Sequence, residues 1–310
     1  MDTLFAGIDV SRDRLDVHLL PQGESFAVER DADGLDRLVQ RFAGLPVAVI
    51  AVEATGGFET LVVAHLAQAG LPVAVVNPDR VRAFARARGQ RAKTDAIDAA
   101  VIARFAQLMQ PPVRQLADAE TRMLADLVSR RRQIVAMRVA ERQRQKRIGD
   151  KRALKSIGRL LKALERELSV CEADITAAIK ALPLWRQQDE LLRSVPGIGP
   201  TIAATLIAEM PELGNLSRKQ VAALAGLAPF TRQSGKWKGK SFIAGGRASI
   251  RSALFMAASV AVLHNSVIKV HFNRLVASGK PWKVAIIACA RKLLTILNAI
   301  LKSGTPWKTA

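Results

Sequence analysis

A long stretch without proline, from about residue 118 to residue 182, limits most strongly what this chain can fold into. Its later part repeats apolar side chains in steps of three and four, which is a heptad seam sustained over four repeats. The seam positions are Leu154, Ile157, Leu161, Leu164, Leu168, Cys171, Ile175, Ala178 and Leu182. An earlier helix over about 119–147 carries Leu124, Leu127, Ile134 and Met137, and Gly149-Asp150 offers a turn. The pattern therefore predicts a helical hairpin or a dimerising coiled coil.

The residues before this stretch follow a different pattern. Apolar runs predict strands over 4–10, 14–20, 24–29, 47–52 and 73–76, and helical periodicity predicts helices over 34–42, 58–69, 79–88 and 94–108. Three strands in a row, followed by alternating helix and strand, indicate an α/β domain with a mixed sheet. Pro111-Pro112 closes that domain. We expect three domains, over 1–112, 113–183 and 184–310, the last mostly helical with a glycine-rich loop at 226–247.

Charge divides the chain into two unequal parts. Residues 1–110 hold 12 Lys/Arg against 14 Asp/Glu, whereas the remaining residues hold 35 against 13. A polyanion is the natural partner of so cationic a region, and nucleic acid is the commonest polyanion. Between residues 130 and 152, ten Lys/Arg face only Glu141 and Asp150. We expect phosphate contacts along this segment, including those of Arg130, Arg131 and Arg132; the alternative is a solvated helix face.

Several counts exclude whole classes of protein. The only cysteines, Cys171 and Cys289, form no CxxC motif, which argues against a disulfide framework and a structural zinc site and fits a reducing cytoplasm. The N-terminus turns acidic at once, unlike a signal peptide. The apolar run from Ala253 to Leu263 is too short to span a bilayer, so we expect no membrane partner and a cytoplasmic protein. The chain contains no tyrosine, which excludes a phosphotyrosine intermediate.

Four carboxylates stand where an α/β sheet places its ligands. Asp9 ends the first strand and Glu53 ends the buried strand VAVIAVE, so the two become neighbours if these strands are adjacent. Asp95 and Asp98 share one face at the start of a helix, although they could also serve only as an N-cap and a dipole-complementing anion. In an RNase H-like order of elements, four such acids form a site for a hard divalent cation.

The motif Gly7-Ile8-Asp9-Val10-Ser11 also resembles the first phosphate loop of sugar and acetate kinases. Those enzymes need a second such loop, typically Asp-x-Gly-Gly, and the helical second half shows none. A kinase is therefore disfavoured.

A longer series of motifs resembles one family in particular. In the first half these are Gly7 to Ser11, Leu15-Asp16-Val17, Glu53-Ala54-Thr55-Gly56, Asn77-Pro78 and Lys93 to Ala99. In the second half they are Val195 to Pro200, Ala225 to Pro229, Gln233-Ser234-Gly235 and Arg247 to Ala257. Together they resemble the DEDD-type insertion-sequence transposases of the insertion sequence 110 family, over nearly the whole chain.

The resemblance implies more than the residues alone can. It implies an RNase H-like, Holliday-junction-resolvase-like domain in which Asp9, Glu53, Asp95 and Asp98 bind Mg²⁺. It also implies a bacterial recombinase whose serine joins DNA covalently, with donor and target DNA sites chosen by a structured, element-encoded guide RNA. Such a protein would act on the nucleoid. The chain departs from the family's frequent doubled serine and doubled glycine, with Gln233-Ser234 and Gly235-Lys236 in their place, and its later basic loop reads Gly245-Gly246-Arg247.

Two serines compete for the role of nucleophile. Ser234 precedes a glycine that permits close backbone approach to a phosphate, is surrounded by cations, and matches the family's serine by position. A polar loop residue bonded to its own backbone is the alternative, and Ser241 is the second candidate. The nucleic-acid contacts that we expect around this loop are Arg232, Lys236, Lys238, Lys240, Arg247 and Arg251. Trp237 among the lysines could stack on a base or seal a core.

Gly197 and Gly199 lie in the segment Pro196-Gly-Ile-Gly-Pro200, which resembles the hairpin of helix-hairpin-helix modules. Their backbone N–H groups could meet a phosphate, and an ordinary turn between helices is the alternative.

Three functions remain in competition. A recombinase with a phosphoserine intermediate would need the serine and the acids on one phosphodiester, so we expect at least a dimer, and a tetramer for two duplexes. A resolvase or nuclease would use the same acids with water as nucleophile. A non-enzymatic nucleic-acid scaffold would keep the basic helices without depending on the acids.

Overall fold

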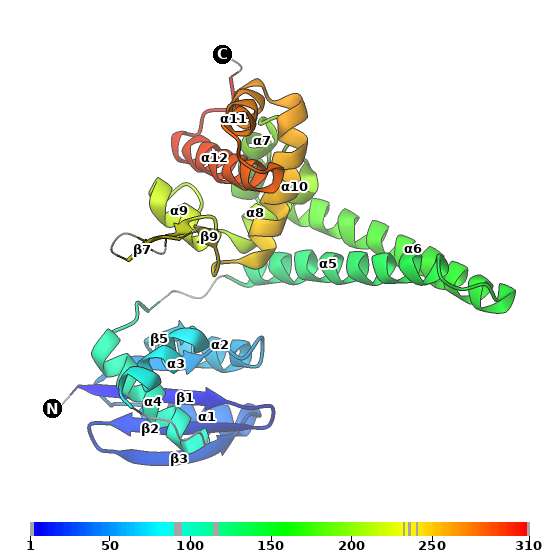
Figure 1. The fold of residues 1–310 in the computed structure, drawn as a ribbon. Helices are drawn as coiled ribbons and strands as arrows, with labels where there is room; N and C mark the ends of the chain where they lie inside the picture. The colour runs from blue at the N-terminus through cyan, green and yellow to red at the C-terminus, as the bar shows by residue number, and fades with distance from the viewer. Residues whose placement is uncertain are drawn as a thin grey trace. The chain divides into compact units, whose positions relative to one another are not determined.

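The structure is a computed structural model that describes residues 3–89, 95–113, 118–231, 233–234, 237–239 and 241–308. The side chains of residues 95–97, 237 and 238 lie outside the described part. The chain folds into two compact units, residues 1–117 and 118–310. Figure 1 colours the first unit from blue to cyan and the second from green to red.

The first unit is built on a mixed sheet of five strands. These are β1 (Leu4–Val10), β2 (Arg14–Leu20), β3 (Glu24–Glu29), β4 (Val47–Glu53) and β5 (Val73–Val76). Their order in the sheet is β3-β2-β1-β4-β5. The first three strands pair antiparallel, and β4 pairs parallel with both β1 and β5. The structure therefore confirms the expected α/β domain with a mixed sheet.

Helices cover both faces of the sheet. Side chains alternate between faces along a strand, and alternate residues of β1 and β2 pack with α1 (Ala32–Phe42) and α2 (Glu59–Gln68). The other face of β4 and β5 packs with α3 (Pro78–Ala87) and α4 (Asp95–Met109). Residues 9 and 53 belong to this second set of positions, so the sheet presents both toward the face that carries α4.

The contact between α4 and β1 has no room for a side chain at Gly7. A Cβ atom there would lie 2.1 Å from the backbone nitrogen of Ala103 and 2.3 Å from the carbonyl oxygen of Ala99. Atoms cannot approach so closely, and the cost of forcing extra volume into a packed core is typically ~1–3 kcal/mol or more. Glycine at this position therefore sets how closely the helix lies against the strand.

The loop after β4 is held by Glu59, the first residue of α2. One carboxylate oxygen accepts hydrogen bonds from the backbone N–H of Gly57 at 2.8 Å and of Thr55 at 3.1 Å. The Thr55 hydroxyl donates a third at 3.0 Å. Burial acts to raise the pKa of Glu59, but these hydrogen bonds outweigh it and hold the pKa below its usual value of 4.5. The loop that follows Glu53 is thereby fixed.

The second unit begins with a helical hairpin, α5 (Ala119–Gln145) and α6 (Lys151–Ala181). The α6 seam is buried from Ile157 to Ile175 as its heptads predict. At its end Ile179 is buried instead of Ala178, because a helix of 3.6 residues per turn drifts from a strict 3.5-residue repeat. On α5, Leu124 and Ile134 are buried, whereas Met137 is 40% exposed and Glu141 is buried further along the helix.

The remaining helices form one apolar core with the base of the hairpin. They are α7 (Pro183–Arg193), α8 (Pro200–Glu209), α9 (Arg218–Leu224), α10 (Ala248–His264), α11 (Ser266–Ala277) and α12 (Trp282–Ser303). Among the described helices α12 is long and apolar enough to cross a membrane, and α10 with α11 would pass only as a pair bent by 98°. Half of the apolar window of α12 is buried inside this unit, so we interpret it as a core helix.

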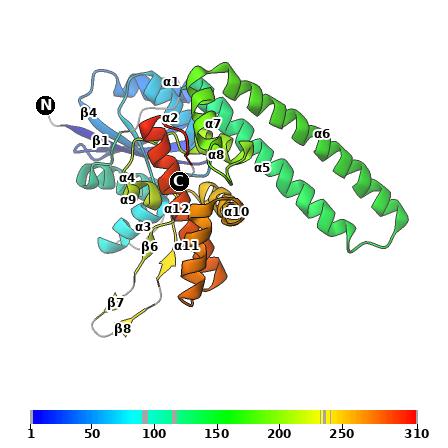
Figure 2. The same ribbon diagram turned by 90° about the horizontal axis from the view of Figure 1, so that it is seen from above.

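The expected glycine-rich loop contains a β-hairpin arm that the sequence analysis missed. At its base β6 (Pro229–Phe230) pairs with β9 (Phe242–Ile243), and toward its tip β7 (Gln233–Ser234) pairs with β8 (Trp237–Lys238). The rings of Phe230 and Phe242 stack at the base with centroids 5.9 Å apart. In Figure 2 the arm extends away from the helices of this unit.

The contacts of Glu59 predict a pH-dependent stability. Because its folded pKa lies below the unfolded one, the carboxylate stabilises the fold fully above about pH 4.5 and loses this effect as the pH falls through the folded pKa. We expect Glu59→Gln to lower the free energy of unfolding by about 1 kcal/mol at pH 7 and by less near pH 3. Urea unfolding at the two pH values measures this. Asp13→Asn, in an exposed turn, is the control, and a deficit that is equal at both pH values would contradict the assignment.

Candidate catalytic and nucleic-acid sites

Asp9 and Glu53 lie side by side at one edge of the sheet. The parallel register of β1 and β4 pairs Ile8 with Val52, and Asp9 and Glu53 each follow by one residue. Both side chains are half-buried. The expectation that their strands are adjacent is confirmed, and it places two carboxylates next to each other.

Helix α4 brings a third carboxylate to the same place. Ala99, whose carbonyl oxygen lies against Gly7, directly follows Asp98. Asp98 is half-buried, and Asp95 is the first residue of the helix, one turn earlier. The side chain of Asp95 lies outside the described part of the structure. The backbone thus gathers at one sheet edge the four acids that the sequence analysis singled out.

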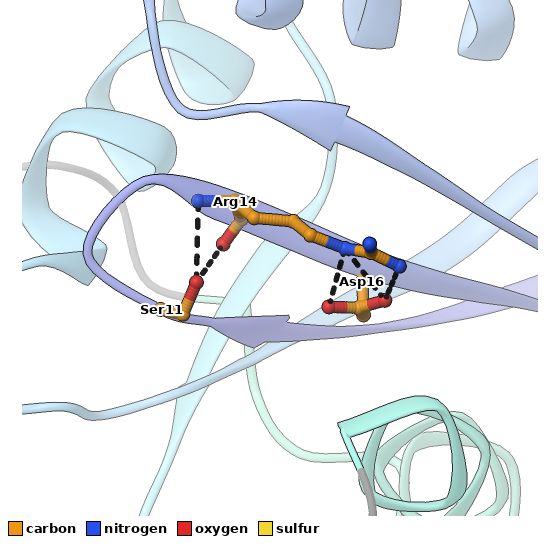
Figure 3. A network of polar contacts seen from close by, with 3 residues as sticks. All are labelled: Ser11, Arg14 and Asp16. Atoms are coloured by element: carbon orange, nitrogen blue, oxygen red, sulfur yellow. Dashed lines mark hydrogen bonds and ion pairs between the residues drawn. The ribbon is translucent and has the colours of Figure 1, made fainter.

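A further acid at this edge, Asp16, was not singled out beforehand. It lies opposite Asp9 in the antiparallel register of β1 and β2, so the two side chains share a face. Asp16 is only 6% exposed, and Arg14 donates to both of its oxygens, with the shortest contact at 2.7 Å. Figure 3 shows this pair beside the tight turn, in which the Ser11 hydroxyl donates to the Arg14 carbonyl at 2.8 Å. The pair neutralises a buried charge next to Asp9.

The donor set at this edge suits one class of ion. All four acids offer carboxylate oxygens, which are ligands that Mg²⁺ prefers, whereas thiol and imidazole ligands favour Zn²⁺. Among the described side chains, no three potential ligands converge closely enough to hold an ion. Asp95 would have to supply part of any such site.

Glu59 was also missed by the sequence analysis, because its hydrogen bonds to Thr55 and Gly57 follow no recognised motif.

Ser234 lies near the tip of the β-hairpin arm. It is exposed and pairs with Trp237 in the antiparallel register of β7 and β8. Ser241 is also exposed and precedes β9 at the arm's base. The expected contacts Arg232, Lys236 and Lys240 lie outside the described residues, as do the side chains of Trp237 and Lys238.

Three of the predicted nucleic-acid residues make ion pairs within the second unit. Arg131 contacts Glu172 of α6 at 2.6 Å and Arg132 contacts Glu209 of α8 at 2.6 Å. Arg247 donates two hydrogen bonds to the carboxylate of Glu212, at 2.6 and 2.7 Å, and one to the carbonyl of Glu209. These contacts tie α5 and the end of the arm to the core. A phosphate would compete with a carboxylate at each of these arginines.

The other predicted contacts differ in their surroundings. Arg130 is exposed and donates to the side-chain oxygen of Gln133, and Arg251 donates to the Gly245 carbonyl in the arm's return loop. Gly197 adopts φ +103°, and a Cβ atom there would lie 2.6 Å from that of Ala261, so packing alone requires glycine. Gly199 has open space around it and is the N-cap of α8.

The distal half of the α5–α6 hairpin is a cationic surface. Eight exposed basic side chains there have no carboxylate partner among the described residues: Lys146, Arg147, Lys151, Arg152, Lys155, Arg159, Lys162 and Arg166. We call them the hairpin-tip cations. The basic segment was expected over 130–152. In the structure the hairpin-tip cations lie nearer the turn between the two helices and continue along α6.

Comparison with known proteins addresses both units. Residues 6–148 match the DEDD model of IS110 proteins, described as a transposase, and residues 189–273 match the transposase IS116/IS110/IS902 family. The chain is 31% identical over 240 residues to the pilin gene-inverting protein of Moraxella bovis, which covers 76% of this chain and 74% of that protein.

A second relative extends further along the chain. The pilin gene-inverting protein of Moraxella lacunata is 30% identical over 261 residues, which covers 83% of this chain and 80% of that protein. The first family match covers the acids of the sheet edge, and the second covers the arm that carries Ser234. The chain therefore belongs to the IS110 family of transposases and is an enzyme that recombines DNA.

Proposed function

We propose that the first unit is an RNase H-like domain in which Asp9, Glu53, Asp95 and Asp98 hold Mg²⁺ at the scissile phosphate of DNA. The observation that carries this proposal is the register of β1 and β4, with α4 packed across it, which gathers the acids at one edge. The strand order β3-β2-β1-β4-β5 supports the RNase H-like assignment. When bound, the ion would neutralise charge that develops on the phosphoryl oxygens.

The acids and their neighbours have separate tasks in this proposal. The four carboxylates would hold the ion, and their mutual repulsion makes the edge selective for a cation. Arg14 neutralises Asp16, so this fifth carboxylate adds no uncompensated charge beside Asp9. Glu59 fixes the loop that follows Glu53. The pairing of β1 with β4, the packing of α4 at Gly7 and the hydrogen bonds of Glu59 therefore hold the backbone of the site in place.

We further propose that Ser234 is the nucleophile. Its hydroxyl oxygen attacks the phosphorus, a phosphoserine bond forms, and the bond to one ribose oxygen breaks, while the serine proton passes to a base or to solvent. A ribose hydroxyl released from another strand then attacks the phosphorus of the phosphoserine. A new phosphodiester bond forms, the bond to the serine oxygen breaks, and the serine hydroxyl takes up a proton again. The exposed position near the tip of a β-hairpin supports this role, because a narrow arm can reach a phosphate in a DNA groove.

The relatives favour rejoining over simple cutting. Both Moraxella relatives are named for inversion of the pilin gene, and inversion requires that every cut end be joined to a new partner. A covalent serine–phosphate bond conserves the energy for that step, whereas hydrolysis by water loses it. We therefore place a recombinase ahead of a resolvase.

Nucleic-acid partners complete the proposal. The hairpin-tip cations supply a surface for phosphates on the second unit. A structured guide RNA, which the family resemblance implies, is the partner that we assign to this cationic surface, and donor and target DNA are the substrates. Two duplexes with cleavage on each require at least two copies of the chain, and a tetramer is expected.

The metal site predicts which acids the reaction needs. Asp98→Asn and Asp9→Asn should each reduce recombination in Mg²⁺ by about a hundredfold or more, because each removes one charge from the ion's surroundings. Asp79→Asn is the matched control, since Asp79 is an exposed acid at the start of α3. Recombination is measured on paired donor and target DNA with circular dichroism to confirm folding. Wild-type activity of folded Asp98→Asn would refute the metal site.

The nucleophile predicts a covalent product at one peptide. On a nicked suicide substrate, mass spectrometry should find a nucleotide attached to the peptide that contains Ser234. Ser234→Ala should abolish this adduct and strand exchange while DNA binding persists, and Ser241→Ala should retain both. An adduct on another peptide would overturn the assignment. Cleavage to free ends without an adduct would favour the resolvase.

A further inference from the structure

A small cleft with two arginines lies in the first unit, away from the acidic edge. It encloses about 220 Å³ between β2, α3 and α4, and His18, Arg88 and Arg104 provide its polar lining. Apolar atoms of Phe84 and Val101 form much of the rest. We call it the arginine cleft. Its volume and lining suit a compact anion that also presents an apolar edge.

The positive charge of the arginine cleft is not compensated by the described residues. Arg104 is half-buried and donates to the amide oxygen of Gln107, and the guanidinium of Arg88 lies 5.8 Å from the centre of the Phe84 ring. Neither has a carboxylate partner among the described residues. Other arginines of the unit, such as Arg14, pair with acids. Two guanidinium groups that line one cleft and have no described carboxylate partner form a candidate anion site.

His18 adds a neutral donor or acceptor to the same cleft. Its Nδ1 lies 2.7 Å from the Ser25 hydroxyl, and burial lowers the pKa of the ring below its usual value. The imidazole is therefore largely uncharged at neutral pH. The other ring nitrogen makes no hydrogen bond to a described residue. The charge that would attract an anion thus comes from the arginines, and His18 contributes a hydrogen bond.

The sheet fixes the position of this cleft relative to the acids. His18 lies opposite Gly7, where α4 crosses β1, and Asp16 lies two residues earlier in β2, opposite Asp9. Two strand residues span ~7 Å. On α4, six residues separate Asp98 from Arg104, which is ~9 Å along the helix axis. Both groups occupy the α4 face of the sheet.

This spacing matches the repeat of a polynucleotide. Successive phosphates along one strand lie ~7 Å apart, because the strand winds around the axis while it rises ~3.4 Å per nucleotide. A strand whose scissile phosphate lies at the acids therefore carries its neighbouring phosphate at about the distance of the cleft, one nucleotide along. Guanidinium groups bind phosphate oxygens through two parallel hydrogen bonds, which fixes orientation as well as distance.

We propose that the arginine cleft binds the phosphate of the cleaved DNA strand that neighbours the scissile one. The inference rests on the proposed function, since it takes the acids as the place of the scissile phosphate. Arg88 and Arg104 act as positioning residues that set where along the strand the acids engage. The partner is DNA, because the cut strand is the one that passes the acids.

The test couples single charges on the protein to single charges on the DNA. Neutral methylphosphonates replace one phosphate at a time on both sides of the mapped cleavage point, and affinity is measured without divalent metal in the complex that recombines. At the position one nucleotide from the scissile phosphate, neutralisation should weaken binding by the wild-type chain roughly tenfold. In Arg104→Gln and in Arg88→Gln the same neutralisation should have little effect, which a double-mutant cycle quantifies.

Controls separate this proposal from the metal site. Arg86→Gln, on the exposed part of α3 and outside the cleft, should keep the wild-type pattern. Asp9→Asn should keep the coupling even if it cannot recombine, so a failure of the catalytic proposal leaves a different signature. The inference is overturned if no phosphate couples to Arg104 and Arg88, or if the coupled phosphate lies far from the cut. Loss of guide-RNA affinity in these variants with unchanged DNA coupling would overturn it as well.

Discussion

The contact of α4 with β1 at Gly7 is the constraint on which the candidate site depends. The backbone of Ala99 and Ala103 lies where any larger residue at position 7 would place its Cβ atom. Because the helix lies this close, its first turn reaches the strand ends that carry Asp9 and Glu53. The same contact places α4 beside β2, which forms the arginine cleft. One glycine thus sets the distance between the acids and the anion site that we propose.

The second unit is organised around ion pairs that cross between its elements. Arg132 of α5 contacts Glu209 of α8, and Arg247 at the end of the arm contacts Glu212. These pairs are partly exposed, so each stabilises the fold only modestly. Their effect is geometric, because they tie the hairpin and the base of the arm to one core. The exposed Ser234 and the hairpin-tip cations extend from that common base.

Sequence periodicity predicted the elements with strong patterns and missed those without one. The buried strand that ends at Glu53 and the seam of α6 repeat regularly, and the structure confirms them. The strands of the arm are two residues long, too short for an alternation to be recognised. The partners of Arg131 and Arg247 lie 41 and 35 residues away in the sequence, so no local pattern could reveal them. Asp16 was visible only as part of a motif, because its burial depends on strand pairing.

Iron-promoted cleavage of the protein tests whether the sheet edge holds a divalent ion. Fe²⁺ bound in place of Mg²⁺ reduces added hydrogen peroxide to hydroxide and a hydroxyl radical, and the radical cuts the backbone beside the ion. We expect Fe²⁺-dependent fragments that end near Asp9, Glu53 and Asp98, that Mg²⁺ suppresses, and that Asp98→Asn eliminates. Absence of cuts at these three positions, or the same cuts in Asp98→Asn, would contradict it.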